Sequence, residues 1–121
     1  MATTGTHEAV VRMLAELAPR GRVLDLGCGE GALSLNLAKR GYEVWALDIA
    51  RPSPRLQRAG IPFALADAEA GLPFADDSFD AVTCVEFIEH LSSPGRVLSD
   101  IARVLKPGGL AVLTTPNILN L

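Results

Sequence analysis

The sequence predicts an α/β fold of the Rossmann-like, doubly wound type, as one domain over residues 1–121 with a mostly parallel sheet of about five strands. Three observations carry this prediction. Short apolar runs alternate along the chain with segments of helical composition. Glycine and proline separate many of these segments. Acidic residues follow the apolar runs at regular intervals, as expected where strands end at one edge of a sheet.

Strands and helices are predicted in alternation over most of the chain. Apolar runs predict strands at about 22–26, 43–47, 62–65, 79–84 and 110–114. Helices are predicted at about 6–17, 32–40, 54–58 and 93–105, with a helical turn near 86–90. Thr6 is the expected cap of the first helix, and segment 69–78 has the composition of a turn. Such alternation requires right-handed crossovers, which place helices on both faces of a parallel sheet.

The most informative segment is 23–32, with the sequence VLDLGCGEGA. The glycines Gly27, Gly29 and Gly31 occupy alternate positions between a predicted strand and a predicted helix. They let the backbone approach a ligand that any Cβ would push away, and the helix start offers N–H groups to an anionic group. A tight turn with no ligand is one alternative. A nicotinamide cofactor is another, since Gly27-x-Gly29-x-x-Ala32 also fits the dinucleotide fingerprint.

A carboxylate ends or closely follows each of the first four predicted strands: Asp25, Asp48, Asp67 and Glu86. We therefore expect these carboxylates at the edge of the sheet where ligands bind. S-adenosylmethionine suits such an acidic rim, because it carries a sulfonium, an ammonium group, ribose hydroxyls and an adenine amine. In this interpretation Asp48 accepts the ribose hydroxyls and Asp67 meets the adenine amine. Ile49 would pack on the adenine face.

These motifs resemble those of the class I S-adenosylmethionine-dependent methyltransferases, of the small-molecule type that includes ubiquinone-biosynthesis O-methyltransferases. The matching segments occur in the family's order and spacing: VLDLGCGEG, ALDIA, ADAEAGLPFADDSFDAV, EFIEHL and ARVLKPGGLAVLTTPN. The resemblance implies an enzyme that transfers a methyl group from S-adenosylmethionine to a small-molecule acceptor. It implies cofactor contacts at Asp25, Gly27, Cys28, Gly29, Gly31, Asp48, Ile49, Asp67, Ala68, Val85 and Glu86.

Composition narrows the partners and the location. A net charge of −3 with scattered lysine and arginine argues against nucleic acid as a partner. No apolar run approaches the roughly 18–20 residues that span a bilayer, so no membrane segment is predicted. Cys28 and Cys84 lie far apart and form no metal-binding or redox motif, which fits a reducing compartment. We therefore expect a cytoplasmic protein.

The sequence departs from the family at its C-terminal end. Family members usually continue past the fifth strand with further helices and an antiparallel pair of strands, which this sequence lacks after Leu121. The strand at 110–114 is then an unprotected edge, and we expect a homodimer through it. The same departure leaves open a truncated domain or a cofactor-binding module without catalysis. No catalytic residue is assigned, although His90 or Glu86 could act as a general base, and the pair offers too few ligands for a metal site.

Overall fold

The structure is a computed structural model that describes residues 4–85 and 87–114. The strands in this part of the chain are β1 (Arg22–Leu26), β2 (Glu43–Asp48), β3 (Phe63–Leu65), β4 (Phe79–Val85) and β5 (Leu105–Thr114). The helices are α1 (Thr4–Leu17), α2 (Ala32–Lys39), α3 (Pro54–Arg58) and α4 (Pro94–Val104), with 3₁₀ turns η1 (Ala68–Ala70) and η2 (Ile88–His90). Strands and helices thus alternate, as the sequence predicts.

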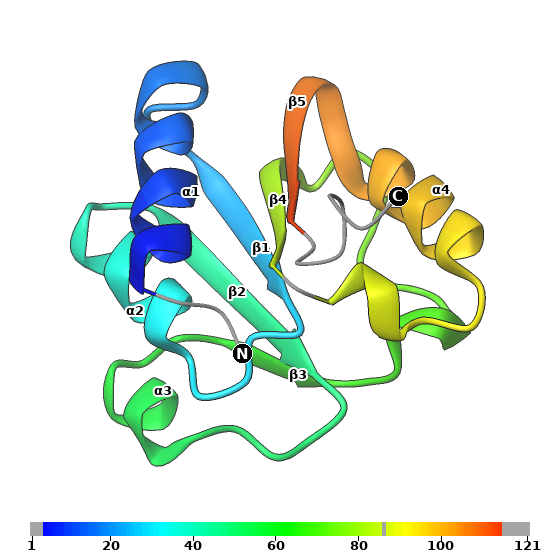
Figure 1. The fold of residues 1–121 in the computed structure, drawn as a ribbon, viewed down its shortest axis with the longest axis horizontal. Helices are drawn as coiled ribbons and strands as arrows, with labels where there is room; N and C mark the ends of the chain where they lie inside the picture. The colour runs from blue at the N-terminus through cyan, green and yellow to red at the C-terminus, as the bar shows by residue number, and fades with distance from the viewer. Residues whose placement is uncertain (1–3, 86, 115–121) are drawn as a thin grey trace.

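The five strands form one sheet in the order β3-β2-β1-β4-β5, and every neighbouring pair is parallel. The first strand, β1, lies in the middle of the sheet, and β2 and β3 follow it outward on one side (Figure 1). β4 then pairs with the other side of β1, and β5 lies beyond β4. This arrangement confirms the doubly wound fold. The order of strands reverses between β1 and β4, and ligands of such sheets bind beside that switch, beyond the carboxyl ends of the strands.

Helices cover both faces of the sheet, because alternate residues of the strands point to opposite sides and both sets are apolar. On one face α1, α2 and α3 pack on the strands, and the buried side chains there include Leu14, Leu37, Leu56, Val23 and Ala81. On the other face α4 and η1 supply the cover (Figure 1), and that core includes Ile101, Ala68, Leu24, Val82 and Phe79. The sheet is therefore a rigid, buried platform for the residues at its edge.

Two expected element boundaries are wrong. α1 begins at Thr4, so Thr6 lies inside the helix and does not cap it. β5 begins at Leu105 rather than at Leu110, because Leu105 already pairs with Phe79 and the register of the pair then shifts before Leu110 meets Ala81. The intervening Lys-Pro-Gly-Gly segment turns tightly, since a Cβ on Gly109 would lie 2.8 Å from the carbonyl oxygen of Lys106.

Candidate cofactor-binding site

The loop 27–31 connects β1 to α2, and its three alternate glycines all have positive φ: 68° at Gly27, 55° at Gly29 and 89° at Gly31. Two of them are required by packing alone. A Cβ on Gly27 would lie 2.5 Å from the Phe87 ring, and one on Gly31 would lie 2.6 Å from the Leu56 side chain. Gly29 differs, because a Cβ there would meet no atom within 4 Å. The packing of a tight turn therefore explains why Gly27 and Gly31 are glycines. Gly29 is different, because its backbone lies next to open space.

Backbone hydrogen bonds fasten this loop to β2. The amides of Gly27 and Cys28 donate to the carbonyl oxygen of Leu47 at 2.9 and 3.2 Å, and the amide of Gly31 donates to Cys28 at 3.0 Å. Gly31 is also the N-cap of α2, which has no side-chain cap hydrogen bond. The loop is thus shaped by main-chain contacts to the neighbouring strand.

Asp48, the last residue of β2, holds the loop from the side. Its Oδ2 accepts from the amide of Gly29 at 2.8 Å, and its Oδ1 accepts from Ile49 at 2.7 Å and Ala50 at 3.2 Å. A carboxylate offers about four acceptor positions, so Oδ2 retains one for a ligand hydroxyl. The long contact from Ala50 is the weakest of the three and is the one that a second hydroxyl would displace. The half-buried carboxylate therefore fits the ribose of an adenosyl group.

Asp25 lies below the loop and is only 2% exposed. Its carboxylate accepts from the Ser34 hydroxyl at 2.7 Å and from the Thr83 hydroxyl at 3.0 Å. Burial raises the pKa of Asp25 to about 6, although these two hydrogen bonds oppose the rise. Asp25 thus ties β1 to α2 and β4, and its direct contact with a cofactor stays a prediction.

The remaining predicted contact residues lie at the ends of β2, β3 and β4. Ile49 is 71% exposed directly after β2, so its apolar side chain is available to a flat ligand. Asp67 caps η1, with its Oδ1 accepting from the amide of Glu69 at 2.9 Å. Ala68 is buried and Val85 is half-buried. Glu86 lies outside the described residues.

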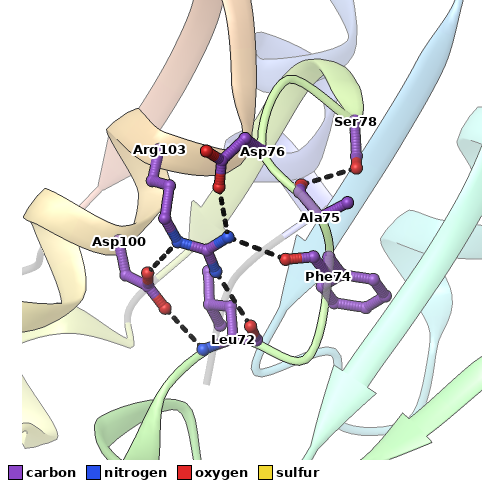
Figure 2. A network of polar contacts seen from close by, with 7 residues as sticks. All are labelled: Leu72, Phe74, Ala75, Asp76, Ser78, Asp100 and Arg103. Carbon is purple, nitrogen blue, oxygen red and sulfur yellow. Dashed lines mark hydrogen bonds and ion pairs between the residues drawn. The ribbon is translucent and has the colours of Figure 1, made fainter.

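Two features of this region were missed at the level of sequence. The first is Phe87, whose ring lies against Gly27. The second is Arg103 of α4, whose guanidinium donates to the segment 72–76 that follows Asp67 and η1, as Figure 2 shows. Both Arg103 and this segment belong to recognised motifs, but nothing in the sequence signals that they meet. Their partners include backbone carbonyls, which leave no sequence signature.

The other reactive side chains offer little chemistry. Burial raises the pKa of the Cys28 thiol to about 12, so it is neither a ready nucleophile nor a metal ligand. Cys84 is fully buried, and His90 is exposed at the end of η2. Among residues 4–85 and 87–114, no cluster of histidine, cysteine, aspartate and glutamate could hold a metal ion. Within the same residues, no helix is long and apolar enough to cross a bilayer.

A family model described as a methyltransferase domain matches residues 24–113. The chain belongs to the class I S-adenosylmethionine-dependent methyltransferases. It is 38% identical over 103 residues to a ubiquinone biosynthesis O-methyltransferase of Xanthomonas oryzae pv. oryzae. This match covers 79% of this chain and 43% of that protein. The chain therefore spans less than half the length of this relative.

Solved structures of a methyltransferase and of a cyclase share the fold. An N-methyltransferase of Haemonchus contortus in complex with phosphomonomethylethanolamine and S-adenosylhomocysteine matches with a TM-score of 0.76 and 27% identity, over 89% of this chain and 28% of that chain. The [4+2]-cyclase SpnF matches with a TM-score of 0.79 and 26% identity, over 95% of this chain and 47% of that chain. Since a cyclase shares the fold, the fold alone does not fix the reaction.

Proposed function

We propose that this chain binds S-adenosylmethionine at the carboxyl ends of β1, β2 and β3 and transfers its methyl group to a small-molecule acceptor. The observation that carries the proposal is the pairing of Gly29 with Asp48. Gly29 presents backbone next to open space, and the carboxylate that binds its amide keeps an acceptor position for a hydroxyl. Exposed Ile49 supplies an apolar surface beside them. The family to which the chain belongs uses this cofactor.

Each group of residues has a distinct role in this proposal. The 27–31 loop receives the methionine portion, Asp48 accepts the ribose hydroxyls, and Ile49 packs on the adenine. Asp67 accepts from the adenine amine, and Ala68 and Val85 contribute backbone near the ring and the sulfur. Hydrogen bonds to a charged partner contribute about 1.5–3 kcal/mol each, so Asp48 is expected to be the strongest single polar contact.

The chain acts mainly by positioning. When bound, S-adenosylmethionine supplies an activated methyl carbon and a thioether leaving group. Methyl transfer is an in-line displacement, so a fixed loop and a fixed Asp48 contribute by holding the donor in one orientation. A general base is needed only where the acceptor must lose a proton, and we assign none.

The test combines binding with turnover. We expect calorimetric binding of S-adenosylhomocysteine, and methyl transfer from labelled S-adenosylmethionine to at least one member of a panel of phenols, amines and thiols. Binding without any turnover would support a second candidate, a cofactor-binding module without catalysis, since the chain spans only 43% of its ubiquinone-biosynthesis relative. Binding of a reduced nicotinamide dinucleotide without affinity for S-adenosylhomocysteine would contradict both.

We also propose that two copies of the chain pair through β5. This strand lies at the end of the sheet, where backbone groups of an edge strand can pair with another chain. Leu113 of β5 and Met13 of α1 are 40% and 43% exposed and line a groove of about 550 Å³. Light scattering should show a dimer at high concentration, and Leu113→Lys should weaken it. A monomer at every concentration would contradict this pairing.

We further propose that the acceptor is a cytoplasmic metabolite rather than a nucleic acid. Support comes from the net charge of −3 and from Cys28 and Cys84, which are thiols and form no disulfide. Cell fractionation should recover the protein in the cytoplasm. In a gel-shift assay, the purified chain should leave the mobility of DNA and RNA unchanged.

A further inference from the structure

The crossover from β3 to β4 has no long helix of its own. It consists of η1 followed by the segment 71–78, which we call the crossover loop. Asp67, the residue proposed to meet the adenine amine, is the N-cap of η1 at the start of this connection. A connection with few internal hydrogen bonds depends on outside contacts for its position. Asp67 is held on its N-terminal side by β3 and by the Ala66 amide, which donates to the carbonyl oxygen of Asp48 at 3.0 Å. On its C-terminal side, its placement depends on whatever holds the crossover loop.

One side chain, that of Arg103, makes three hydrogen bonds to the crossover loop. The Arg103 guanidinium donates from Nη1 to the carbonyl oxygen of Phe74 at 2.8 Å and to the carboxylate of Asp76 at 2.9 Å. Its Nη2 donates to the carbonyl oxygen of Leu72 at 2.9 Å. Figure 2 shows the planar group inserted between α4 and the crossover loop. A fork of several donors holds a loop in one place better than a single ammonium group does.

Asp100 binds both Arg103 and the crossover loop. Its carboxylate accepts from Arg103 Nε at 2.6 Å and, through its other oxygen, from the amide of Leu72 (Figure 2). Arg103 and Asp100 lie on α4, whose inner face is anchored in the core by Val97, Ile101 and Val104. The loop is thus fastened to a helix that is itself fixed to the sheet.

The C-terminal end of the crossover loop is held by main-chain contacts, because the amides of Asp77 and Ser78 donate to the carbonyl oxygens of Arg103 and Val104 at 3.0 and 2.7 Å.

Two further contacts lie at η1 and in the middle of the loop. At the η1 end, the Glu69 carboxylate accepts from the amide of Ser93 at 2.8 Å, just before α4 begins. In the middle, the Phe74 ring packs edge-on against Trp45 of β2 and Phe79 of β4, with centroid distances of 5.6 and 5.1 Å. The crossover loop is therefore located relative to β2, the strand that ends in Asp48.

We propose that Arg103 is a positioning residue for adenine recognition: it holds the crossover loop on α4 and so keeps Asp67 where the adenine amine is read. This inference rests on the proposed function. Without the guanidinium fork, Leu72, Phe74 and Asp76 each lose a donor, and the connection to Asp67 samples more positions. A ligand must then order that connection on binding, which weakens the contacts that depend on it.

The test measures recognition of the adenine amine rather than stability. The probes are S-adenosylhomocysteine and S-inosylhomocysteine, in which an oxo group replaces that amine. The wild-type chain should prefer the adenosyl form roughly tenfold, as expected for one charged hydrogen bond. Arg103→Lys should reduce that preference to about threefold or less. The matched control is Arg22→Lys, because Arg22 also pairs with a carboxylate, that of Glu43. Its site lies at the opposite ends of the strands, and the preference should stay unchanged.

The outcomes separate this inference from the proposed function. If Arg103→Lys binds and discriminates like the wild type, the inference is overturned while the proposed function stands. A wild-type chain that binds both probes equally, or a loss of preference in Arg22→Lys as large as in Arg103→Lys, would also overturn it. A wild-type chain that binds neither probe would overturn the proposed function and the inference together. Should Arg103→Lys not fold, Asp100→Asn weakens the same attachment and takes its place, with the same expected loss of preference.

Discussion

The two sides of the proposed cofactor site are built in different ways. The 27–31 loop is held by backbone hydrogen bonds to β2 and by Asp48, and two of its glycines have no room for a Cβ. The crossover loop has three hydrogen bonds to the side chain of Arg103, across 27 to 31 residues of sequence, and no glycine motif shapes it. An added Cβ should therefore lower stability most on the first side, and loss of the Arg103 guanidinium should lower it on the second.

The largest expected effect comes from an added methyl group on the first side. Gly31→Ala forces a Cβ within 2.6 Å of the fully buried Leu56 side chain at a φ of 89°. Overpacking and left-handed strain together should lower the free energy of unfolding by about 4 kcal/mol, measured by urea denaturation. Gly60→Ala is the control, because φ is 71° there and no atom lies within 4 Å, so only about 1 kcal/mol should be lost. Equal losses would contradict the packing account.

Asp25, beneath the same loop, predicts an unusual dependence of stability on pH. Burial raises its pKa from 3.8 to about 6, so the folded state holds this proton more tightly than the unfolded state. Its contribution to stability is therefore fully present below about pH 4 and is lost as the pH rises to about 6, by about 3 kcal/mol. Asp25→Asn cannot titrate. Its free energy of unfolding relative to the wild type should rise by that amount between about pH 4 and pH 7, whereas a constant difference would contradict a raised pKa.

On the second side, removing the fork tests the dependence on one side chain. Arg103→Ala leaves two backbone carbonyls and two carboxylates without their donor. We expect a loss of about 2 kcal/mol in the free energy of unfolding. Arg22→Ala removes an ion pair whose side chains are 45% and 61% exposed, so its loss should stay below about 1 kcal/mol. Similar losses in a thermal or urea titration would show that Arg103 is an ordinary surface residue.

The smallest effect concerns the polar contact to the ligand. Asp48→Asn keeps the shape of the side chain but removes the charge, and the replacement amide nitrogen cannot accept from Gly29 or from a hydroxyl. Affinity for S-adenosylhomocysteine should fall about tenfold, or about 1.4 kcal/mol. Glu30→Gln removes a negative charge from the same loop, and its affinity should stay within about twofold. A similar decrease in both variants would assign the effect to net charge alone.

The contrast between the two sides of the site also explains which of its features the sequence could predict. The bounds of β1 and α3 agree with the structure, and the alternation of strands and helices correctly predicted a parallel, doubly wound sheet, because these depend on local patterns. The start of β5 was missed because its pairing with β4 continues through a Lys-Pro-Gly-Gly segment that reads as a turn. Arg103 was missed because its partners lie in a distant segment and two of them are main-chain carbonyls. The sequence thus predicted contact residues on both sides of the site, Asp67 and Ala68 included, but not the long-range contacts that hold the second side.

The most direct test of the central claim, that open backbone at Gly29 receives the cofactor, is a calorimetric titration of two alanine variants with S-adenosylhomocysteine. A Cβ meets no protein atom within 4 Å at Gly29 or at Gly60, and φ is 55° and 71° at these positions, so both variants should fold alike. We predict that Gly29→Ala lowers the affinity at least about tenfold and that Gly60→Ala leaves it within about twofold. Equal affinities for the two variants would contradict the claim.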